Sequence, residues 1–532
     1  MSNDLSFSPV LRTDAPVIIV GAGIGGLASA LRLVARGMPV TVLEQHGWIG
    51  GKIRTLPSAA GPVAAGPTVL TMRHVFDDLF AEAGALLEDH VTLHADPILA
   101  RHVWADGSQL DLLADPEASI DAIRAFSGAR SAKEFRRFHR DTAGLFDAMD
   151  APMMQAADPS VARLGATVMT RPGMWPIMRP GRTLRHLLKN RFSDPRLAQL
   201  FGRYATYVGG SPLASPALLA LIWQAEARGV WTLKNGLASL ISALAYQITQ
   251  LGGEICCDCG VARLVTDGNR VTAVETNGGQ ILPARAVVFN GDPRALASGH
   301  LGRDVNTVAS QTQHCDRSLS ARVWSFAAKA SGVELAHHNV FFGDDPESEF
   351  CDLAAGLMPR DPTLYICAQD RGHGVTDGPE RFEIILNAPP LDMAGPVQRE
   401  AEKCHQRTFP RLARMGLDLT PPPPPDTLTT PAMFDQMFPG SLGSLYGQSP
   451  HGMTAALARP RARSGMAGLY LCGGGTHPGA GVPMAALSGR HAAEAIATDL
   501  ALPSTSHRTD MPGGMSTGSA MMARAPSRSS PS

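Results

Sequence analysis

The stretch Pro16-Val-Ile-Ile-Val-Gly-Ala-Gly-Ile-Gly-Gly-Leu27 leads through a helical run into Val40-Thr-Val-Leu-Glu44. The residues from Val17 to Val20 are β-branched and wholly apolar, which is typical of a buried parallel strand. A glycine-rich turn follows directly, and the second apolar run ends in an acidic residue. This order of strand, glycine turn, helix, strand and acid predicts the βαβ unit of a dinucleotide-binding domain.

The glycines of the turn have separate physical roles. Gly21 permits the tight turn after the strand, Gly23 lets the backbone approach a pyrophosphate, and Gly26 lets helix and strand pack closely. Glu44 follows one strand later, where a carboxylate can accept hydrogen bonds from a ribose. These four positions predict the adenosine end of a dinucleotide site.

A second glycine pair indicates which dinucleotide binds. Gly50-Gly51-Lys52-Ile53-Arg54-Thr55 follows the acidic residue almost at once. It adds backbone donors and positive charge near a diphosphate. Nicotinamide-dependent enzymes usually continue from the acidic strand into another βα unit, which this sequence does not do at once. We therefore predict FAD as the cofactor, although the glycine pair taken alone fits an ordinary turn equally well.

The composition excludes several classes of function. The chain has 532 residues, enough for two or three domains, and its formal net charge of −1 gives no general attraction to nucleic acid. Cys256, Cys257 and Cys259 cluster without the spacing of a zinc site, so we expect no metal and a reducing, cytoplasmic location. No stretch predicts a transmembrane span or a secretory signal, so any membrane association is expected to be peripheral.

The chain is predicted to contain a discontinuous FAD-binding domain of the Rossmann-like α/β class. Its three segments are residues 15–94, 228–294 and 462–500. The stretches between them would form an inserted α+β substrate domain with a helical, membrane-access region, residues 95–227 and 295–461. Both tails are predicted to be disordered because they cannot bury enough apolar surface, residues 1–14 and 503–532.

A glycine-rich sequence near the C-terminus carries the second informative pattern. Thr476-His-Pro-Gly-Ala-Gly-Val-Pro-Met484 follows Gly473-Gly474-Gly475, and a helix is predicted from about Val482 to Leu500. The amides at the start of such a helix would face whatever occupies the turn, and reduced flavin is negatively charged around N1 and C2=O. The pattern therefore predicts the flavin end of the site.

With this second pattern the chain resembles the bacterial carotenoid and phytoene desaturase family. The resemblance rests on Val17–Thr55 and on Tyr470-Leu-Cys-Gly-Gly-Gly-Thr-His-Pro-Gly-Ala-Gly-Val482, and it extends over nearly the whole chain except the tails. Ala65-Gly-Pro-Thr-Val-Leu-Thr-Met-Arg73 and Pro216-Ala-Leu-Leu-Ala-Leu-Ile-Trp-Gln224 look most like the branch acting on hydroxylated acyclic carotenoids. The resemblance implies an FAD-dependent desaturase that forms the C3–C4 double bond of a 1-hydroxy or 1-methoxy substrate of the neurosporene or lycopene type.

The resemblance also implies roles for ten residues at the cofactor. It places the ADP half on Gly21, Gly23, Gly26 and Glu44, and the diphosphate or flavin near Lys52 and Arg54. It places the adenine beside Val261, and the rest of the cofactor near Asp292, Gly474 and Met484. Without the resemblance, Val261 is a plain strand residue and Asp292 begins an Asp-Pro turn.

The implied chemistry needs few protein groups. Flavin N5 can take a hydride, so the protein must chiefly hold the reacting C–C bond within roughly 3–3.5 Å of it. His477 is a candidate proton acceptor, although a structural or solvated histidine is the simpler interpretation. Arg73 and His74 are candidates for contacting the terminal hydroxyl of the substrate, and the alternative is the exposed start of a helix. The terminal electron acceptor, such as oxygen or a quinone, is left open.

The segment 161–192 predicts contact with a membrane surface. It holds no acidic residue and seven cations, Arg163, Arg171, Arg179, Arg182, Arg185, Lys189 and Arg191. Trp175 and several methionines lie between them. Because a carotenoid does not travel freely through water, we expect peripheral association with the inner or photosynthetic membrane, each cation contributing about 1 kcal/mol on anionic lipid. The alternative is a solvated basic helix whose apolar residues face the core.

Three other functions stay open. Phytoene desaturase is the nearest competitor. A flavin amine oxidase would share the N-terminal half, but its usual C-terminal pattern differs from Pro478-Gly-Ala-Gly-Val-Pro483. A non-catalytic prenyl-chaperone would share the fold without needing redox chemistry.

Overall fold

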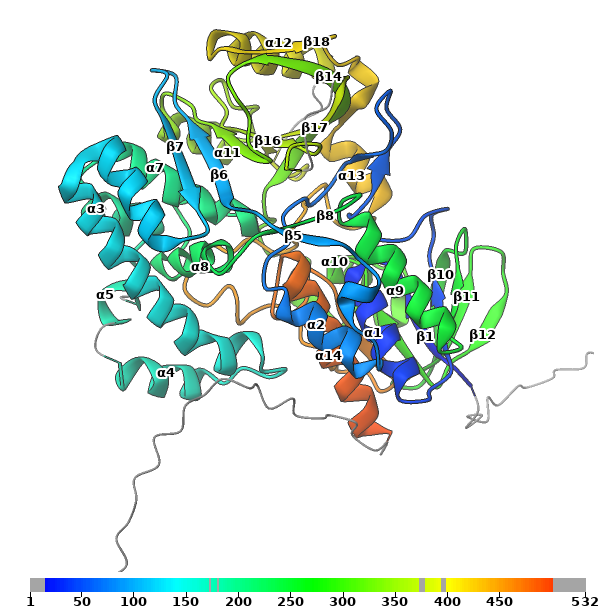
Figure 1. Ribbon diagram of the computed structural model, residues 1–532. Helices are drawn as coiled ribbons and strands as arrows, with labels where there is room; N and C mark the ends of the chain where they lie inside the picture. Colours follow the sequence, from blue (N-terminus) through cyan, green and yellow to red (C-terminus); the bar gives the residue numbers. More distant parts are fainter. Residues whose placement is uncertain (1–14, 172–173, 179–180, 373–377, 394–398, 501–532) are drawn as a thin grey trace, which may run out of the picture.

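The computed structural model describes residues 15–171, 174–178, 181–372, 378–393 and 399–500. The tails predicted to be disordered, and Arg179 of the basic segment, lie outside the described residues. In Figure 1 the N-terminal βαβ unit and the C-terminal helix lie together at the lower right. A second sheet lies above them, and a group of helices lies at the left.

A five-stranded parallel sheet forms the centre of the lower part, in the order β20-β13-β1-β2-β9. Its strands come from the beginning, middle and end of the chain: β1 (Val17–Val20), β2 (Val40–Leu43), β9 (Glu254–Cys256), β13 (Ala286–Phe289) and β20 (Leu469–Leu471). Three helices cover one face: α1 (Ile24–Ala35), α9 (Ala238–Gln250) and α14 (Val482–Asp499). A small antiparallel sheet packs on the other: β10 (Val261–Asp267), β11 (Arg270–Thr276) and β12 (Ile281–Pro283).

The first strand shows why this sheet needs an uninterrupted apolar sequence. Val17 and Ile19 pack into the core that the strand shares with the helices. Ile18 points the other way and packs in the core that contains Val271 and Val274 of the small sheet. Since successive side chains of a strand face opposite sides, a strand buried on both faces requires an apolar residue at every position.

The second sheet is mostly antiparallel and has the order β18-β14-β17-β16-β15-β6-β7, with β19 paired to β14. Its strands β6 and β7 come from residues 95–227 and the others from residues 295–461, and parallel pairing of β6 with β15 joins the two stretches. The strands are β6 (Ile98–Val103), β7 (Gln109–Leu113), β14 (Ser320–Gly332), β15 (His338–Phe341), β16 (Leu364–Ala368), β17 (Glu380–Ala388), β18 (Leu417–Thr420) and β19 (Leu428–Thr429).

The helices of the first insertion surround an aromatic core that includes Phe135, Phe201 and Trp223. They are α3 (Pro116–Met149), α4 (Val161–Met169), α5 (Trp175–Met178), α6 (Leu184–Arg191), α7 (Pro195–Gly202) and α8 (Trp223–Ala227), with the 3₁₀ segments η4 (Arg203–Val208) and η5 (Ala217–Ile222). The remaining helices are α2 (His74–Glu82), α10 (Pro293–Ala297), α11 (Pro346–Ala354), α12 (Glu400–Arg414) and α13 (Pro431–Met437). Four short strands complete the fold, β3 (Thr55–Leu56), β4 (Val63–Ala64), β5 (Leu93–Ala95) and β8 (Trp231–Leu233).

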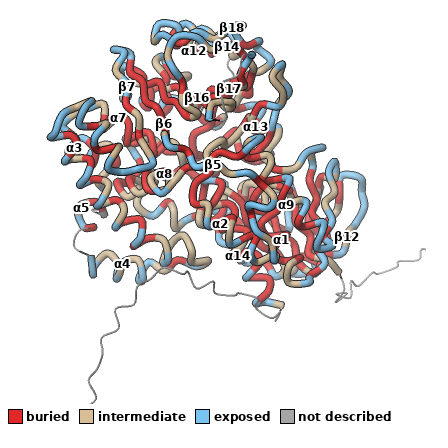
Figure 2. Tube along the Cα trace, in the orientation of Figure 1, coloured by how far each residue is buried: buried red, intermediate tan, exposed pale blue. Residues whose placement is uncertain are grey.

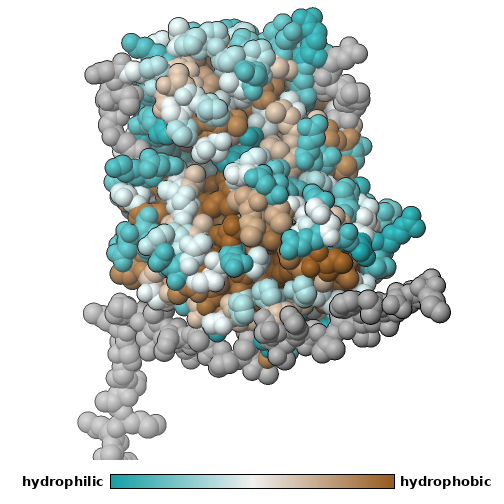
Figure 3. Space-filling model, turned by 90° about the vertical axis from the view of Figure 1, so that its right-hand side faces the viewer, coloured by the Kyte–Doolittle hydropathy of each residue, from teal (hydrophilic) through white to brown (hydrophobic). Residues whose placement is uncertain are grey.

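The surface differs between the two parts of the molecule. Figure 2 shows buried residues concentrated along both sheets and exposed residues on the outer helices and loops. In Figure 3 the upper end is mainly hydrophilic, whereas hydrophobic residues reach the surface in the middle and lower part of the face shown. Among the residues that the structure describes, no helix combines the length and apolar character that crossing a bilayer requires.

Candidate active site

Two cavities meet in the interior of the protein. The smaller has a volume of about 500 Å³ and is lined by the N-terminal glycine turn and by Gly473–Gly475. The larger has a volume of about 790 Å³ and is lined by residues of both insertions and by the turn before α14. Pro67, Tyr446 and residues 480–482 line both cavities. The two cavities are therefore adjacent and share part of their wall.

The glycine turn is packed too closely for side chains. A Cβ on Gly26 would lie 2.3 Å from the carbonyl oxygen of Gly21, and one on Gly25 would lie 2.8 Å from the amide nitrogen of Gly473. Gly21 also has a φ of 100°, which glycine adopts without strain. Gly21 and Gly23 line the smaller cavity, whereas Gly26 is not among its lining residues and acts by letting α1 pack on the turn.

Asn290 holds the two glycine turns together, and sequence reasoning missed it. Its side-chain amide donates to the Gly21 carbonyl oxygen at 3.0 Å. Its Oδ1 lies 2.8 Å from the place where a Cβ of Gly473 would be. The available signal was its position directly after the apolar strand β13, since polar residues at the carboxyl ends of parallel strands face the ligand site.

Glu44 sits at the carboxyl end of β2 with 4% of its surface exposed. Its carboxylate accepts hydrogen bonds from the backbone amides of Ala22, at 2.7 Å, and His46, at 3.0 Å. The residue lines the smaller cavity, so its remaining lone pairs are available to ribose hydroxyls.

Two helix N-termini show that the smaller cavity fits FAD. Gly23 precedes α1 and Gly481 precedes α14, neither provides a side-chain cap, and the first turn of each helix holds no acid. Both glycines line the cavity, so two sets of backbone amides with partial positive charge face the same space. These are complementary to a diphosphate at one end and to a reduced flavin at the other. Gly474 also lines this space, and a Cβ there would meet no atom within 4 Å.

Buried cations lie along the same cavity. The Lys52 ammonium donates to the Leu445 carbonyl oxygen at 2.6 Å, and burial lowers its pKa to about 8, with Arg317 and Arg459 adding to the decrease. Asp292 opposes it: this carboxylate caps α10 through the Arg294 amide and forms a buried ion pair with Arg317. Lys52 and Asp292 both line the cavity, and their contact with the cofactor stays a prediction.

Four other predicted residues have different surroundings. Val261 lines the smaller cavity and Met484 lines the larger one. Arg54 lines neither and donates to Thr429 Oγ1 at 2.6 Å. His477 also lines neither: its Nε2 pairs with the Ala156 carbonyl oxygen at 2.9 Å, and burial lowers its pKa. A structural role for His477 fits these contacts.

The two residues suggested for the substrate hydroxyl lie at the surface. Arg73 pairs with Asp77 at 3.2 Å and with Glu88 at 2.6 Å, and His74 is the exposed first residue of α2. Neither lines either of the two cavities. Their contact with substrate stays a prediction that this geometry does not support.

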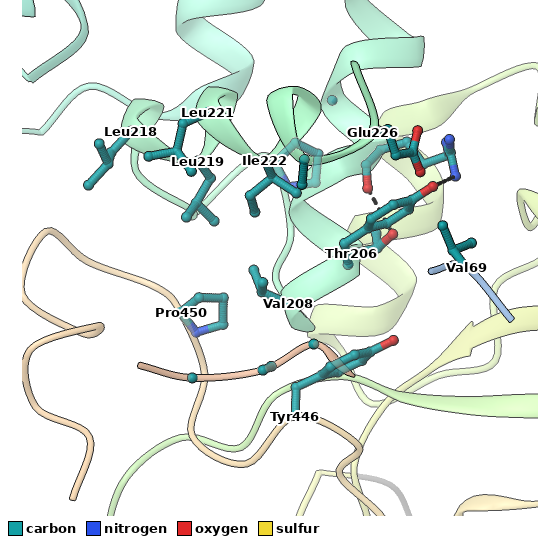
Figure 4. Close-up of a pocket in the computed structure, with 18 of the residues that line it drawn as sticks. Val69, Thr206, Val208, Leu218, Leu219, Leu221, Ile222, Glu226, Tyr446 and Pro450 are labelled. Carbon is teal, nitrogen blue, oxygen red and sulfur yellow. Dashed lines mark hydrogen bonds between the residues drawn. The ribbon is translucent and has the colours of Figure 1, made fainter. Parts of the chain in front are cut away.

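The walls of the larger cavity are mostly apolar. They include Val69, Val208, Leu218, Leu219 and Ile222, which Figure 4 shows around the space opposite Tyr446. One part of the wall is polar and includes Arg203, Tyr207 and Glu226. At another part, Arg185 and the exposed Lys189 of the basic segment line the cavity. Sequence reasoning missed this polar part of the wall.

Comparison with known proteins agrees with the geometry. The family described as flavin containing amine oxidoreductase matches residues 24–315 and 411–497. The hydroxyneurosporene desaturase of Cereibacter sphaeroides is 55% identical over 91% of this chain and 98% of its own length. The lycopene-forming phytoene desaturase of Pseudescherichia vulneris is more distant, at 30% identity over 91% and 99%.

A solved structure supports the fold class. Cyclohexylamine oxidase from Brevibacterium oxydans superposes with a TM-score of 0.56 at 17% sequence identity, covering 92% of this chain and 100% of that one. At this identity the likeness concerns the fold alone. Together with the family match, it confirms the predicted Rossmann-like FAD-binding class.

Proposed function

Since the chain belongs to the flavin-containing amine oxidoreductase family and, within it, to the hydroxyneurosporene desaturases, we propose that it desaturates the end of an acyclic carotenoid. The double bond forms between C3 and C4 of a 1-hydroxy or 1-methoxy substrate of the neurosporene or lycopene type. The enzyme is an oxidoreductase acting on a CH–CH group, and its cofactor is FAD. Phytoene desaturation is disfavoured because the phytoene desaturase compared above is much less similar.

The observation that carries this proposal is the meeting of the two cavities. Pro67, Tyr446 and residues 480–482 line both, so the end of a chain in the larger cavity reaches the flavin end of the smaller one. When bound, FAD supplies a two-electron oxidant that accepts a hydride from carbon. The protein holds the reacting C–C bond at that junction and keeps bulk water from it with an apolar wall.

The amides before α14 contribute electrostatically. Residues 480–482 lie at the junction and the helix begins at Val482 with no acid in its first turn. The positive end of the helix therefore favours negative charge at this place, by roughly 0.3–1 kcal/mol at an exposed site and up to about 2 kcal/mol in partly buried geometries. This favours the reduced form of the cofactor and hence removal of hydride from the substrate.

A peripheral contact with the membrane completes the proposal. Val161, Met169 and Trp175 are 71%, 69% and 50% exposed, close in sequence to the basic residues of the same segment. Lys189 of this segment also lines the larger cavity, so a carotenoid can pass from the bilayer surface to the cavity. Met174, Ile177 and Leu184 are buried in the core instead, so the proposed apolar membrane contact rests on the exposed residues named above. The electron acceptor would be oxygen or a membrane quinone.

The test supplies the FAD-loaded enzyme in liposomes with 1-hydroxyneurosporene, with phytoene or with a polyamine. A bathochromic shift of the carotenoid spectrum with the hydroxylated substrate alone is the expected result. Turnover of phytoene alone, or of the polyamine, would contradict the proposal. A purified protein that is not yellow, or whose flavin does not bleach when substrate is added, would favour the prenyl-chaperone alternative.

A further inference from the structure

A buried group of polar side chains interrupts the apolar wall of the larger cavity. Arg203 and Tyr207 come from η4 and Glu226 comes from α8, and all three line the cavity. Arg203 donates through Nη1 to the Tyr207 hydroxyl at 2.7 Å, and the Tyr204 hydroxyl donates to Glu226 Oε2 at 2.5 Å. Figure 4 shows Glu226 with Thr206 and Val69 on the side of the cavity that faces Tyr446.

Arg203 retains hydrogen-bonding capacity that no neighbour uses. It is only 7% exposed, and among the described residues neither its Nε nor its Nη2 has a hydrogen-bond partner. The guanidinium lies over the rings of Tyr204 and Tyr207, at 5.2 and 4.9 Å from their centres. Burial raises the pKa of both tyrosines well above the usual range, so their hydroxyls stay neutral. A buried cation with two unpaired donor nitrogens is suited to an acceptor oxygen, which a ligand in the cavity can supply.

The position of this group suits an oxygen near the reacting bond. Pro67 lines both cavities, and the next residue, Thr68, shares a hydrogen bond of 2.7 Å with the Tyr365 hydroxyl. Tyr365 in turn lies close enough to Tyr207 for Tyr207 to contribute to its raised pKa, of which burial is the main cause. Thr68 and Tyr365 also line the larger cavity, so its polar side chains begin next to a residue that lines both cavities. In a 1-hydroxycarotenoid the oxygen is only three bonds from C3, so its partner must lie near the cofactor.

We propose that Arg203 and Glu226 bind the terminal oxygen of the acyclic carotenoid and thereby select oxygenated chain ends. Arg203 donates to the oxygen, and the Glu226 carboxylate accepts the hydrogen of a hydroxyl. The inference rests on the proposed desaturation and adds the residues that determine its specificity. A hydrocarbon end would leave the guanidinium without a partner, and a site built to hydrogen-bond a group strongly disfavours an analogue that lacks it.

The two residues make separable contributions because hydroxyl and methoxyl oxygens differ. Both oxygens accept from Arg203, but only the hydroxyl can donate to Glu226. Arg203→Met should therefore weaken binding of both oxygenated ends and strengthen binding of a hydrocarbon end, which no longer leaves a buried guanidinium unpaired. Glu226→Gln should weaken binding of the hydroxyl end more than binding of the methoxyl end.

The experiment measures binding of desaturation products to the FAD-loaded full chain, so that turnover does not interfere. The probes are 3,4-didehydro carotenoids of equal polyene length carrying a 1-hydroxyl, a 1-methoxyl or no oxygen. Binding is followed by the shift of the polyene absorption. We expect wild-type enzyme to prefer the hydroxylated probe over the hydrocarbon about 100-fold. Arg203→Met should reduce this preference to below about 5-fold, whereas the control Arg196→Met, which lies outside the cavity, should keep it.

The results separate this inference from the proposed function. If wild-type enzyme desaturates a hydroxylated carotenoid while Arg203→Met keeps the 100-fold preference, the assignment of Arg203 is wrong and the function stands. If wild-type enzyme shows no preference at all, the substrate class itself is wrong. Should Arg203→Met not fold, as judged by circular dichroism, Glu226→Gln decides: an unchanged hydroxyl-to-methoxyl binding ratio overturns the proposal. In steady-state kinetics, both variants should raise KM for hydroxylated substrate more than they lower kcat.

Discussion

The Glu44 carboxylate and the Ala22 amide are joined by a hydrogen bond of 2.7 Å. This bond links the end of β2 to the glycine turn after β1, so the acid and the turn that we propose for the adenosine end of FAD are held as one unit. The second oxygen of Glu44 is held by the His46 amide. The carboxylate is thereby oriented before any cofactor arrives.

Replacement of Glu44 tests this arrangement. Glu44→Gln keeps an acceptor but loses the charge, so we expect FAD affinity to fall about 10-fold, since charge-assisted hydrogen bonds are roughly twice as strong as neutral ones. Glu44→Ala should lower it further. Fluorescence titration of the apoprotein with FAD measures the effect. The control is Glu275→Gln, which breaks a surface ion pair with Arg263. Equal affinities for both variants and the wild type would contradict the assignment.

Two glycine variants separate packing from cofactor contact. In Gly26→Ala the new Cβ would lie 2.3 Å from the Gly21 carbonyl oxygen, so we expect the apoprotein to lose about 3 kcal/mol or more of stability. In Gly474→Ala the Cβ meets no protein atom within 4 Å. That variant should unfold at the wild-type temperature yet bind FAD more weakly, because its methyl group enters the cavity. Thermal unfolding with and without FAD distinguishes the two, and identical behaviour of both variants would be inconsistent with this site.

Lys52 should make FAD binding depend on pH. Burial lowers its pKa to about 8, with Arg317 and Arg459 adding to the decrease and Asp292 opposing it. FAD is an anion and therefore binds better when the Lys52 amine is protonated. Above pH 8 the free protein has lost this proton, so FAD binding takes up a proton. Affinity should fall by at most about tenfold per pH unit as the pH rises from 8. Lys52→Met should bind more weakly at pH 7 and show a flat profile up to pH 9.5.

The same pKa shift has the opposite effect on the apoprotein. Between pH 8 and 10.5, the usual pKa of a lysine, the unfolded chain holds a proton that the folded chain has released. The free energy of unfolding of the apoprotein should therefore rise with pH in this window, relative to Lys52→Met. Urea unfolding at pH 8, 9 and 10 measures it, and parallel profiles for the two proteins would refute the assignment.

The folded protein should become more stable when residue 383 carries no charge. The residue lies in β17 with no exposed surface, and burial raises its pKa well above the usual range although Arg54 and the backbone of Gly66 oppose the shift. Because the unfolded chain ionises first, stability falls as the pH rises through 4.5 and beyond. Glu383→Gln should therefore gain at least about 1 kcal/mol at pH 7 and little at pH 4. Glu380, on the same strand as Glu383, forms an ion pair with Arg371, and Glu380→Gln, which breaks this pair, should gain nothing.

Membrane contact through the basic segment is tested by Trp175→Ser. Trp175 is 50% exposed, and its loss should weaken binding to anionic liposomes by about 5- to 10-fold, the effect of losing one buried aromatic anchor. Tyr246→Ser, with 53% exposure on α9, is the control. High salt should release the wild-type protein. Equal sedimentation of all three proteins with liposomes would exclude this surface.

The sequence predicted the parts of the site that local patterns encode. Gly21, Gly23 and Glu44 stand at fixed spacings within one βαβ unit, so their roles follow from a short stretch of chain. Asn290 was missed because its contact with Gly21 spans 269 residues and no periodicity signals it.

The substrate side of the site was less accessible to sequence reasoning. Arg203 and Glu226 lie in short helical segments among apolar residues, and only the folded cavity brings them together. The candidates Arg73 and His74 lie at the start of α2, where Arg73 is half-buried in ion pairs and His74 is exposed. Polarity in a sequence does not indicate which side of a helix faces a cavity.

The order of strands in the parallel sheet has a consequence for synthesis of the protein. Strand β20 pairs with β13, and α14 packs on α1, although some 450 residues separate the two helices. While the chain emerges from the ribosome, the sheet of the N-terminal βαβ unit stays incomplete until nearly the whole protein has been synthesised. FAD can therefore be captured only at the end of translation, and a chain that stops before Leu469 should be colourless and exposed to proteases.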